Sequence, residues 1–247
     1  MNMHYNFTII IPHKNIPKLL QRCLDSIPVR DDIQIIIIDD NSENLDKKNF
    51  PGQGRKNTYI IFSNKSLTAG GARNLGLKKA GGKWLLFADS DDFFHQNFSI
   101  ILDKYVKSEY DLIYFGMDSV FSENLKPANR ASHIPALLKK ASLNDEKAKN
   151  IIRFKFLYPS CKLIKKELVV NNKIIFDEVP ASNDTMFGIK VSFAAKKILY
   201  LDDILYCLTH RENSLVTSYN YKNLKSRLLV SFRLYFFLKN IGKEEYA

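Results

Sequence analysis

The chain has 247 residues, of which 45% are hydrophobic and 12% aromatic. A chain of this length and apolar content can bury a sizeable core, which excludes wholesale disorder and predicts one large α/β domain or a domain with a small appendage. Lysine and arginine number 37 against 26 aspartates and glutamates, a formal net charge of +11. Such an excess fits an anionic partner: nucleic acid, a nucleotide, a phospholipid surface or a phosphorylated substrate.

The cysteine pattern argues against a disulfide framework and against a structural zinc site. Cys23, Cys161 and Cys207 are odd in number and form no Cys-x-x-Cys pair. The segment before Phe7 lacks the basic start of a signal peptide, and no apolar run reaches the ~18 residues of a membrane span. The sequence therefore predicts a protein of the cytoplasm.

Five short apolar runs in the first half of the chain predict strands. They are rich in β-branched and aromatic residues, and several are continuous, as in strands buried on both faces of a parallel sheet. Helix-like stretches at 18–26, 71–80 and 98–108 alternate with them, and this alternation predicts right-handed βαβ units with helices on both faces. The apolar runs are 7–11, 34–38, 58–62, 84–88 and 112–115.

The second half of the chain is less regular. A helix is expected near 134–140, and 154–176 has the mixed character of strand and helix. A further helix is expected over 183–195, with Asn183 or Ser182 as its N-cap.

Two acidic clusters follow two of the predicted strands. Asp39-Asp40-Asn41-Ser42 follows one strand, and Asp89-Ser90-Asp91-Asp92 follows another. Because open α/β sheets bind ligands beyond the carboxyl ends of their strands, both clusters are candidate ligand sites. Neighbouring carboxylates repel unless a cation or a donor compensates them, and Mg²⁺ or Mn²⁺ takes oxygen ligands. The alternative is that these residues only cap helices and build turns.

A glycine pair at the start of the helix predicted over 71–80 is the third feature. Gly70 and Gly71 suit either a bound phosphate or a close backbone approach. Arg73 could bind an anion or pair with a strand-end aspartate, and the alternative is a plain loop with a solvated arginine.

Four motifs lie in the first 95 residues: Ile9 to Asn15, Ile36 to Ser42, Gly71 to Gly76 and Leu86 to Asp92. Their order and spacing carry more information than any one of them. Together they resemble the family 2 glycosyltransferases of the GT-A fold, and weaker similarities at 161–168, 183–187 and 210–215 extend the resemblance over most of residues 7–218. The family implies an α/β fold with a Rossmann-like, mostly parallel central sheet and helices on both faces, followed here by a helical C-terminal tail.

The resemblance also implies a division of the chain. Residues 1–218 would form the GT-A domain, with a nucleotide-sugar-binding half over 1–117 and an acceptor-binding half over 118–218. Residues 219–247 would form the helical tail.

The resemblance assigns the nucleotide-sugar to the ends of the first two strands and to the glycine-rich helix. Pro12, His13, Asn15 and Asp40 would lie against the base, with Asp40 accepting a hydrogen bond from it. Arg73 would help to shape the same pocket. His13 departs from the residue type that the family often has at its position.

The second acidic cluster matches the Asp-x-Asp motif of the family. Asp91 would ligate Mn²⁺ or Mg²⁺, which bridges the diphosphate, and Asp89 would lie near the ribose and contribute to the metal site. Asp92 could share either role. A bound divalent cation neutralises the charge that grows on the leaving diphosphate.

Asp184 matches the catalytic base of the family. A positioned carboxylate that takes the acceptor proton typically contributes 10²–10⁴-fold to the rate. The residue before it is Asn183, where the family more often has Glu, and the alternative is an ordinary first-turn helix acid. His210 and Arg211 would hold the diphosphate or the acceptor, and a solvated rim is the alternative.

The function implied is an inverting, metal-dependent transfer of a sugar from a nucleotide-diphosphate sugar to a hydroxyl of a glycan or lipid-linked acceptor. A uridine nucleotide is the default of the family, with guanosine or thymidine donors left open. A catalytically inactive nucleotide-sugar-binding homologue is the second hypothesis. Nucleic-acid binding is the third, and it is disfavoured because the acidic clusters would repel phosphate.

The tail over 224–238 mixes apolar residues with spaced cations that do not share one helical face. A helix lying on the inner face of the cell membrane is one interpretation, and lipid-linked acceptors would suit it. Packing on the catalytic domain and a dimer contact are the alternatives.

Overall fold

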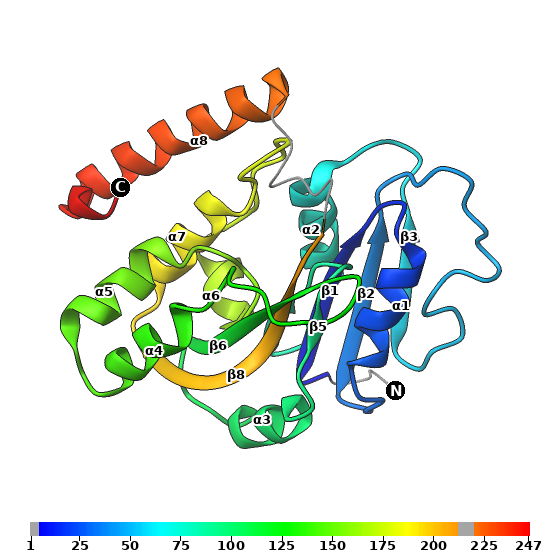
Figure 1. Ribbon diagram of the computed structural model, residues 1–247, viewed down its shortest axis with the longest axis horizontal. Helices are drawn as coiled ribbons and strands as arrows, with labels where there is room; N and C mark the ends of the chain where they lie inside the picture. The colour runs from blue at the N-terminus through cyan, green and yellow to red at the C-terminus, as the bar shows by residue number, and fades with distance from the viewer. Residues whose placement is uncertain (1–4, 212–219) are drawn as a thin grey trace.

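The predicted strands join one sheet in the computed structural model, which describes residues 5–211 and 220–247 (Figure 1). Within these residues the sheet has eight strands in the order β3-β2-β1-β4-β7-β6-β8-β5. The strands are β1 Phe7–His13, β2 Ile33–Asp39, β3 Thr58–Phe62, β4 Trp84–Phe87, β5 Phe93–Phe94, β6 Leu112–Phe121, β7 Lys162–Lys165 and β8 Ile198–His210.

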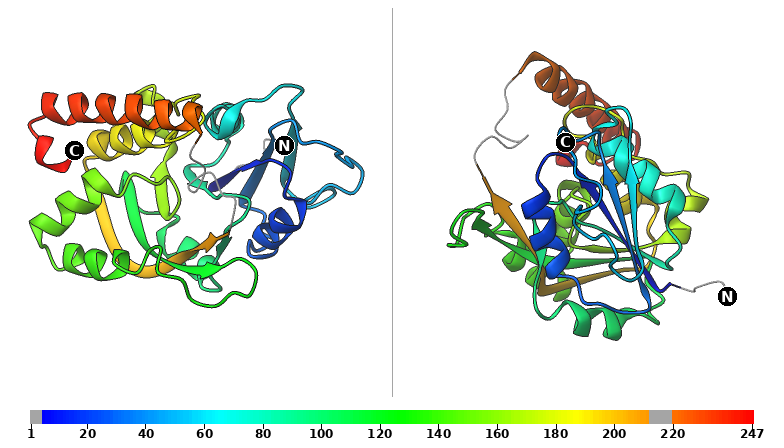
Figure 2. Two further views of the ribbon diagram at one scale, coloured as in Figure 1. Left: turned by 45° about the horizontal axis from the view of Figure 1, so that its top comes forward. Right: turned by 90° about the vertical axis from the view of Figure 1, so that its right-hand side faces the viewer.

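The first half of the sheet has the doubly wound form that the sequence predicts. Strands β3, β2, β1 and β4 pair in parallel. Every residue of β1 and β2 is buried, which explains their continuous apolar sequence. Helix α1 connects β1 to β2, toward one edge of the sheet, and α2 connects β3 to β4 in the opposite direction. Because both crossovers are right-handed, the two helices lie on opposite faces of the sheet (Figure 2).

The second half of the sheet mixes directions. Strand β7 runs antiparallel between β4 and β6, whereas β6 and β8 pair in parallel. The β6–β8 register shifts on both sides of Gly116, where a side chain would collide with the Asp202 carbonyl. Strand β8 curves strongly along its length (Figure 1), as expected for a bulged pair.

Most of the helices predicted from the sequence are present, but the N-cap of α7 differs and α5 is an additional helix. Helix α7 begins after Asp184, so Asp184 is its N-cap, in place of Asn183 or Ser182. Helix α5 lies where the sequence analysis predicts none, and its N-cap Asp145 accepts a hydrogen bond from Ala148 N. The helices are α1 Pro17–Asp25, α2 Thr68–Lys79, α3 Phe98–Tyr105, α4 Ile134–Ser142, α5 Glu146–Lys155, α6 Lys166–Asn171, α7 Thr185–Ala194, α8 Tyr221–Asn240 and the 3₁₀ turn η1 Glu244–Tyr246.

The C-terminal helix α8 packs across α7 (Figure 1). Val230 and Leu238 form a small apolar cluster with Phe154, Met186 and Ile189, separate from the main core around the sheet. Among the described residues, no helix is long and apolar enough to cross a membrane.

Candidate active site

A buried hydrogen-bond network fixes the carboxyl ends of β1 and β2. The His13 Nδ1 atom lies 2.8 Å from Asp39 Oδ1, and its Nε2 atom accepts from Ile16 N at 3.2 Å. The Asp39 carboxylate also accepts from the backbone N–H and the hydroxyl of Ser42. Burial lowers the pKa of His13, although Asp39 opposes the shift. The imidazole is therefore neutral near pH 7, with its proton on Nδ1.

This network gives His13 a role in the fold. Its side chain is fully buried, and both ring nitrogens have partners within the protein. His13 thereby holds the end of β1 against the end of β2, and its expected place near the nucleotide base stays a prediction.

The other residues expected at the base lie around this network. Pro12 is buried in β1, whereas Asn15 is exposed and accepts from Glu43 N at 2.8 Å. The buried Asp40 carboxylate accepts from Leu67 N and lies 3.7 Å from Lys14 Nζ. These contacts join the loops that follow β1, β2 and β3.

A hollow of about 380 Å³ adjoins these loops. Its wall includes His13, Asn15, Ser42 and Phe50. The hollow does not extend to Arg73 or to the second acidic cluster. The hollow therefore adjoins the residues expected near the base, His13 and Asn15, and not those expected at the metal.

Hydrogen bonds from strand β8 hold the second acidic cluster in place. Asp89 N donates to Tyr206 Oη at 2.8 Å, and the Thr209 hydroxyl donates to the Asp91 carbonyl at 2.8 Å. The buried Asp92 carboxylate accepts from Thr209 N at 2.7 Å. The sequence analysis does not predict Tyr206 and Thr209, because they reach the cluster only through the β5–β8 pairing.

The three carboxylates differ in exposure and in partners. The Asp89 side chain is 48% exposed and that of Asp91 21% exposed, whereas Asp92 is buried. Burial raises the pKa of Asp92 well above its ordinary value, and the charges of Asp91 and Asp89 raise it further. Asp91 accepts from Arg211 Nε at 2.7 Å. Asp89 and Asp91 can therefore face a ligand, while Asp92 supports the loop.

His210 ends β8 beside this cluster. Its side chain is exposed and stands edge-on to Phe121, with ring centroids 5.5 Å apart. The similarity noted at 210–215 continues into residues 212–219, which lie outside the described residues.

Arg73 joins the two halves of the molecule. Its buried guanidinium donates to Asp89 Oδ1 at 2.5 Å and to Asn183 Oδ1 at 2.8 Å. It also lies over the ring of Phe176, 5.4 Å from the centroid. The acidic loop and the start of α7 therefore meet at the Arg73 side chain. The sequence predicts its pairing with a strand-end aspartate but not its hydrogen bond to Asn183.

Asp184 stands at this meeting point. Burial raises the pKa of its carboxyl; Arg73 and Lys162 oppose this shift, and Asp89 adds to it. Its neighbour Asn183 shares the Arg73 guanidinium with Asp89, which brings the start of α7 to the acidic loop. A carboxylate with a raised pKa is a better proton acceptor than an ordinary aspartate.

Lys162 is a buried cation that the sequence analysis does not predict as a functional residue. Burial lowers its pKa to about 7. Its Nζ donates to the Phe156 carbonyl at 2.7 Å and lies 5.0 Å from the centroid of the Tyr114 ring. The surrounding sequence shows a lysine in an apolar strand but gives no sign of its nearness to Asp184.

Gly70 decides between the two interpretations of the glycine pair. A side chain at Gly70 would collide with the Asp177 carbonyl, whereas one at Gly71 would meet a tight contact with the Leu67 side chain and ordinary contacts with Glu178. The structure therefore shows a close backbone approach at Gly70, between the start of α2 and the segment that leads to α7.

Comparison with known proteins identifies the architecture. The model of the family described as "Glycosyl transferase family 2" matches residues 8–170. The chain belongs to this family. The match spans β1 to α6 and thus both acidic clusters, whereas Asp184 lies beyond it.

Curated relatives of this family 2 chain are bacterial glycosyltransferases. GlyA of Streptococcus pneumoniae is 26% identical over 84% of this chain and 31% of its own length. EpsJ of Bacillus subtilis, described as an uncharacterized glycosyltransferase, is 24% identical over 84% of this chain and 62% of its own. The chain thus spans less than two thirds of these relatives. A poly(ribitol-phosphate) beta-glucosyltransferase of Bacillus spizizenii is 28% identical over 81% of this chain and 31% of its own.

Among solved structures, TarS of Staphylococcus aureus (residues 1–349, in complex with UDP-GlcNAc) superposes with a TM-score of 0.70. It is 22% identical, and the match covers 87% of this chain and 62% of that one. This likeness confirms the GT-A fold predicted from the sequence.

Proposed function

We propose that this family 2 chain transfers a sugar from a nucleotide-diphosphate sugar to a hydroxyl of a cell-surface glycan or its lipid-linked precursor. The observation that carries the proposal is the Arg73 guanidinium, which ties Asp89 at a strand end to Asn183, the neighbour of Asp184. One cation thereby brings the donor-side acid and the base candidate to a common region. The solved complexes of TarS with UDP-GlcNAc and with UDP support a uridine donor.

Asp184 acts as the general base. It takes the proton of the acceptor hydroxyl while the oxygen attacks the anomeric carbon from the face opposite the diphosphate. The bond from that carbon to the diphosphate oxygen breaks, and the nucleoside diphosphate leaves with the bonding electrons. A single displacement of this kind inverts the configuration of the anomeric carbon. The raised pKa of Asp184 suits proton transfer from a weakly acidic hydroxyl.

The Asp89–Asp92 loop fits a hard divalent cation. Its side-chain donors are carboxylate oxygens. Burial first and then the charges of Asp91 and Asp89 raise the pKa of Asp92, and a bound cation would relieve the repulsion among the three carboxylates. Asp91 and Asp89 would hold Mn²⁺ or Mg²⁺, because their side chains are partly exposed and that of Asp92 is buried. When bound, the ion would neutralise charge on the leaving diphosphate.

A thermal-shift panel tests the donor proposal. The full chain is heated with UDP, GDP, TDP or CDP, each with Mn²⁺ or with EDTA. A ligand that binds only the folded state adds about 2.7 kcal/mol at a hundredfold excess over Kd. We expect a clear rise in Tm with UDP and Mn²⁺ that EDTA and Asp91→Asn both remove. No shift with any diphosphate would contradict the proposal, and strongly salt-dependent binding of DNA or RNA would favour the nucleic-acid hypothesis.

The inactive-homologue hypothesis has one observation in its favour, which is Asn183. Its amide oxygen accepts from Arg73, so an acidic residue is not required there for the fold. Nucleotide binding without turnover, unchanged by Asp184→Asn, would establish that alternative. Turnover of UDP-sugar that depends on Asp184 would exclude it.

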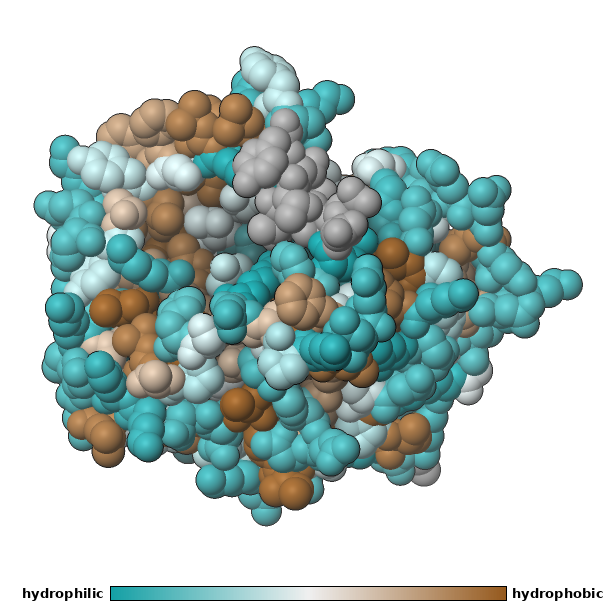
Figure 3. All heavy atoms as spheres, viewed as in Figure 1, coloured by the Kyte–Doolittle hydropathy of each residue, from teal (hydrophilic) through white to brown (hydrophobic). Residues whose placement is uncertain are grey.

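The exposed face of α8 supports peripheral docking on the inner face of an anionic membrane. Opposite the face that packs on α7, the helix exposes a stripe of large apolar side chains, and brown spheres mark the middle of this helix in Figure 3. Helix α8 carries five lysines and arginines and no acidic residue. An apolar stripe on a purely cationic helix matches a lipid surface with acidic headgroups. The stripe comprises Tyr221, Leu224, Leu228, Leu229, Phe232, Tyr235 and Phe236.

Vesicle co-sedimentation tests this docking. We expect binding to vesicles that contain phosphatidylglycerol, weak binding to pure phosphatidylcholine, and loss of both in Phe232→Ser/Phe236→Ser. Ile100→Ser on α3, which removes an equally exposed apolar side chain, is the control and should bind as wild type. Self-association that the double variant abolishes, without vesicle binding, would assign the stripe to a second copy instead.

A further inference from the structure

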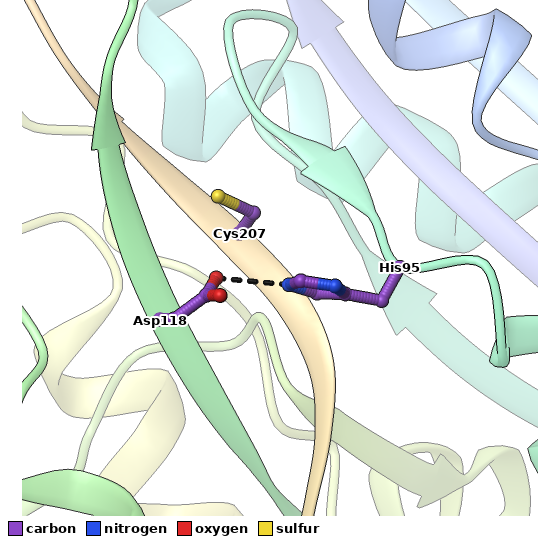
Figure 4. Close-up of side chains that lie close together, drawn as sticks. All are labelled: His95, Asp118 and Cys207. Carbon is purple, nitrogen blue, oxygen red and sulfur yellow. Dashed lines mark hydrogen bonds and ion pairs between the residues drawn. The ribbon is translucent and has the colours of Figure 1, made fainter. Parts of the chain in front are cut away.

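A second group of metal-ligand side chains lies apart from the Asp89–Asp92 carboxylates. His95, Asp118 and Cys207 offer one ligand atom each, and these atoms all lie within 4.8 Å of one another (Figure 4). The His95 Nε2 atom lies 2.9 Å from Asp118 Oδ1. In Figure 4 the three side chains converge from separate parts of the sheet.

The sheet itself fixes these three positions. Cys207 on β8 is the register partner of Asp118 on β6 and of Phe93 on β5. His95 follows β5 directly, and its backbone N–H donates to the Leu205 carbonyl at 3.0 Å. Cys207 lies in β8, and pairing with β8 holds the other two residues, so little rearrangement of the main chain is needed to bring the side chains together.

We propose that His95, Asp118 and Cys207 bind Zn²⁺. A thiolate and an imidazole favour zinc over the hard ions that carboxylates alone select. Bond lengths of 2.0–2.3 Å place tetrahedral zinc ligands about 3.3–3.8 Å apart. Ligand atoms that lie as far as 4.8 Å apart would close in by about 1 Å, whereas His95 Nε2 and Asp118 Oδ1, at 2.9 Å, would separate by a few tenths of an ångström. His95 and Asp118 are partly exposed while Cys207 is buried, which leaves the exposed side for a water as the fourth ligand.

Cys207 is a thiol in the unliganded protein. Burial raises its pKa, the hydrogen bond and charge of Asp118 and the charge of Asp92 raise it further, and the Arg22 guanidinium opposes the shift. Binding of Zn²⁺ would therefore release the thiol proton, since the thiolate is the form that ligates the ion.

A zinc ion at this position would tie the acidic loop to the sheet. Cys207 is flanked by Tyr206 and lies two residues from Thr209, and both of these partners brace the Asp89–Asp92 segment. His95 follows Asp92 after only the two residues of β5. The ion would thus fix the C-terminal end of the Asp89–Asp92 segment. This role does not depend on the proposed sugar transfer.

Metal titration of the full chain tests the site. Zn²⁺ affinity is measured by competition with a chromophoric chelator, and Co²⁺ is used as a probe for its thiolate charge-transfer band in the near ultraviolet. We expect one equivalent of Zn²⁺ and a Co²⁺ thiolate band. Loss of even an outer-shell partner weakens metal sites 10–100-fold, so Cys207→Ser and His95→Asn should each cost at least about 100-fold in affinity.

Matched variants separate this site from other groups. Cys23→Ser removes another buried cysteine and His133→Asn an exposed histidine, and both should leave Zn²⁺ affinity and the Co²⁺ band unchanged. Asp91→Asn removes a ligand of the proposed donor metal and should also leave them unchanged, so the two proposals fail independently. Circular dichroism checks that each variant folds, and Asp118→Asn serves if Cys207→Ser does not. Equal Zn²⁺ affinity in wild type and in the ligand variants, or no thiolate band, would overturn the inference.

Discussion

The two halves of the sheet carry the candidate site in different ways. In the first half, β3, β2, β1 and β4 pair in parallel, and each acidic cluster directly follows its strand along the chain. In the second half, β7, β6, β8 and β5 pair segments that are far apart in sequence. The first half therefore presents its carboxylates through local sequence, whereas the second half supplies their supports and Asp184 through tertiary contacts.

The seam between the halves is where the difference matters. Arg73 crosses it by hydrogen bonds, and Gly70 permits the close approach of α2 to Asp177. Neither half holds both the strand-end acids and the base candidate. Variants of Asp184, Arg73, Gly70 and Asp92 therefore test whether the site depends on the contact between the two halves.

The largest effect is expected from Asp184→Asn, which removes the proposed base. We expect kcat to fall by about 10²–10⁴-fold, with the Kd for nucleotide changed less than about threefold. Steady-state kinetics and calorimetric binding of UDP measure the two quantities. Asp145→Asn changes another N-cap aspartate, on α5, and should leave kcat unaltered. Equal losses of turnover and of affinity in Asp184→Asn would show that the residue is structural.

Arg73→Met should be the most destabilising change at the seam. It deletes two charge-assisted hydrogen bonds of a buried guanidinium, and we expect a loss of about 2–3 kcal/mol in unfolding free energy. Arg233→Met deletes the exposed pair with Asp177, which should contribute less than about 1 kcal/mol. Urea denaturation compares the two variants. Similar losses would mean that Arg73 does not join the halves.

Adjacent glycines of α2 offer a second comparison at the seam. Gly70→Ala forces a methyl group against the Asp177 carbonyl and should destabilise by about 1–3 kcal/mol, as overpacking does. Gly71→Ala places a methyl group 3.3 Å from the Leu67 side chain, a tight contact that better helix propensity offsets, so its net effect should lie within about 1 kcal/mol of zero. Thermal unfolding separates the two, and equal tolerance of alanine would refute the close approach.

The smallest effect concerns the pH dependence of stability through Asp92. Its pKa is raised in the folded protein, so the folded state binds more protons than the unfolded state between the unfolded pKa, about 3.9, and the folded one. The contribution of Asp92 to stability therefore falls as pH rises through that window and is greatest below it. Asp92→Asn keeps an acceptor for Thr209 N and should flatten this part of the profile, measured by denaturation between pH 4 and 8. An unchanged slope would mean that other groups cause the pH dependence.

The sequence predicts the first half of the fold nearly to the residue. Buried parallel strands such as β1 and β2 show as unbroken isoleucine runs, and the acids that end them follow in the next positions. The sequence does not reveal the hydrogen bond between His13 and Asp39, because it joins two different strands. Helix α5 is also unpredicted, since its lysine-rich sequence resembles a polar loop.

The sequence by itself determined the parallel βαβ half, the two strand-end acid clusters and the kinship to family 2, because these depend on neighbours in the chain. Tertiary structure alone decided the partners of those acids: Tyr206 and Thr209 beneath the loop, Arg211 on Asp91, and Asn183 across the seam on Arg73. It also decided that His95, Asp118 and Cys207 meet. The physical reason is that strand pairing between distant segments sets these distances, and no local periodicity encodes which distant residues become neighbours.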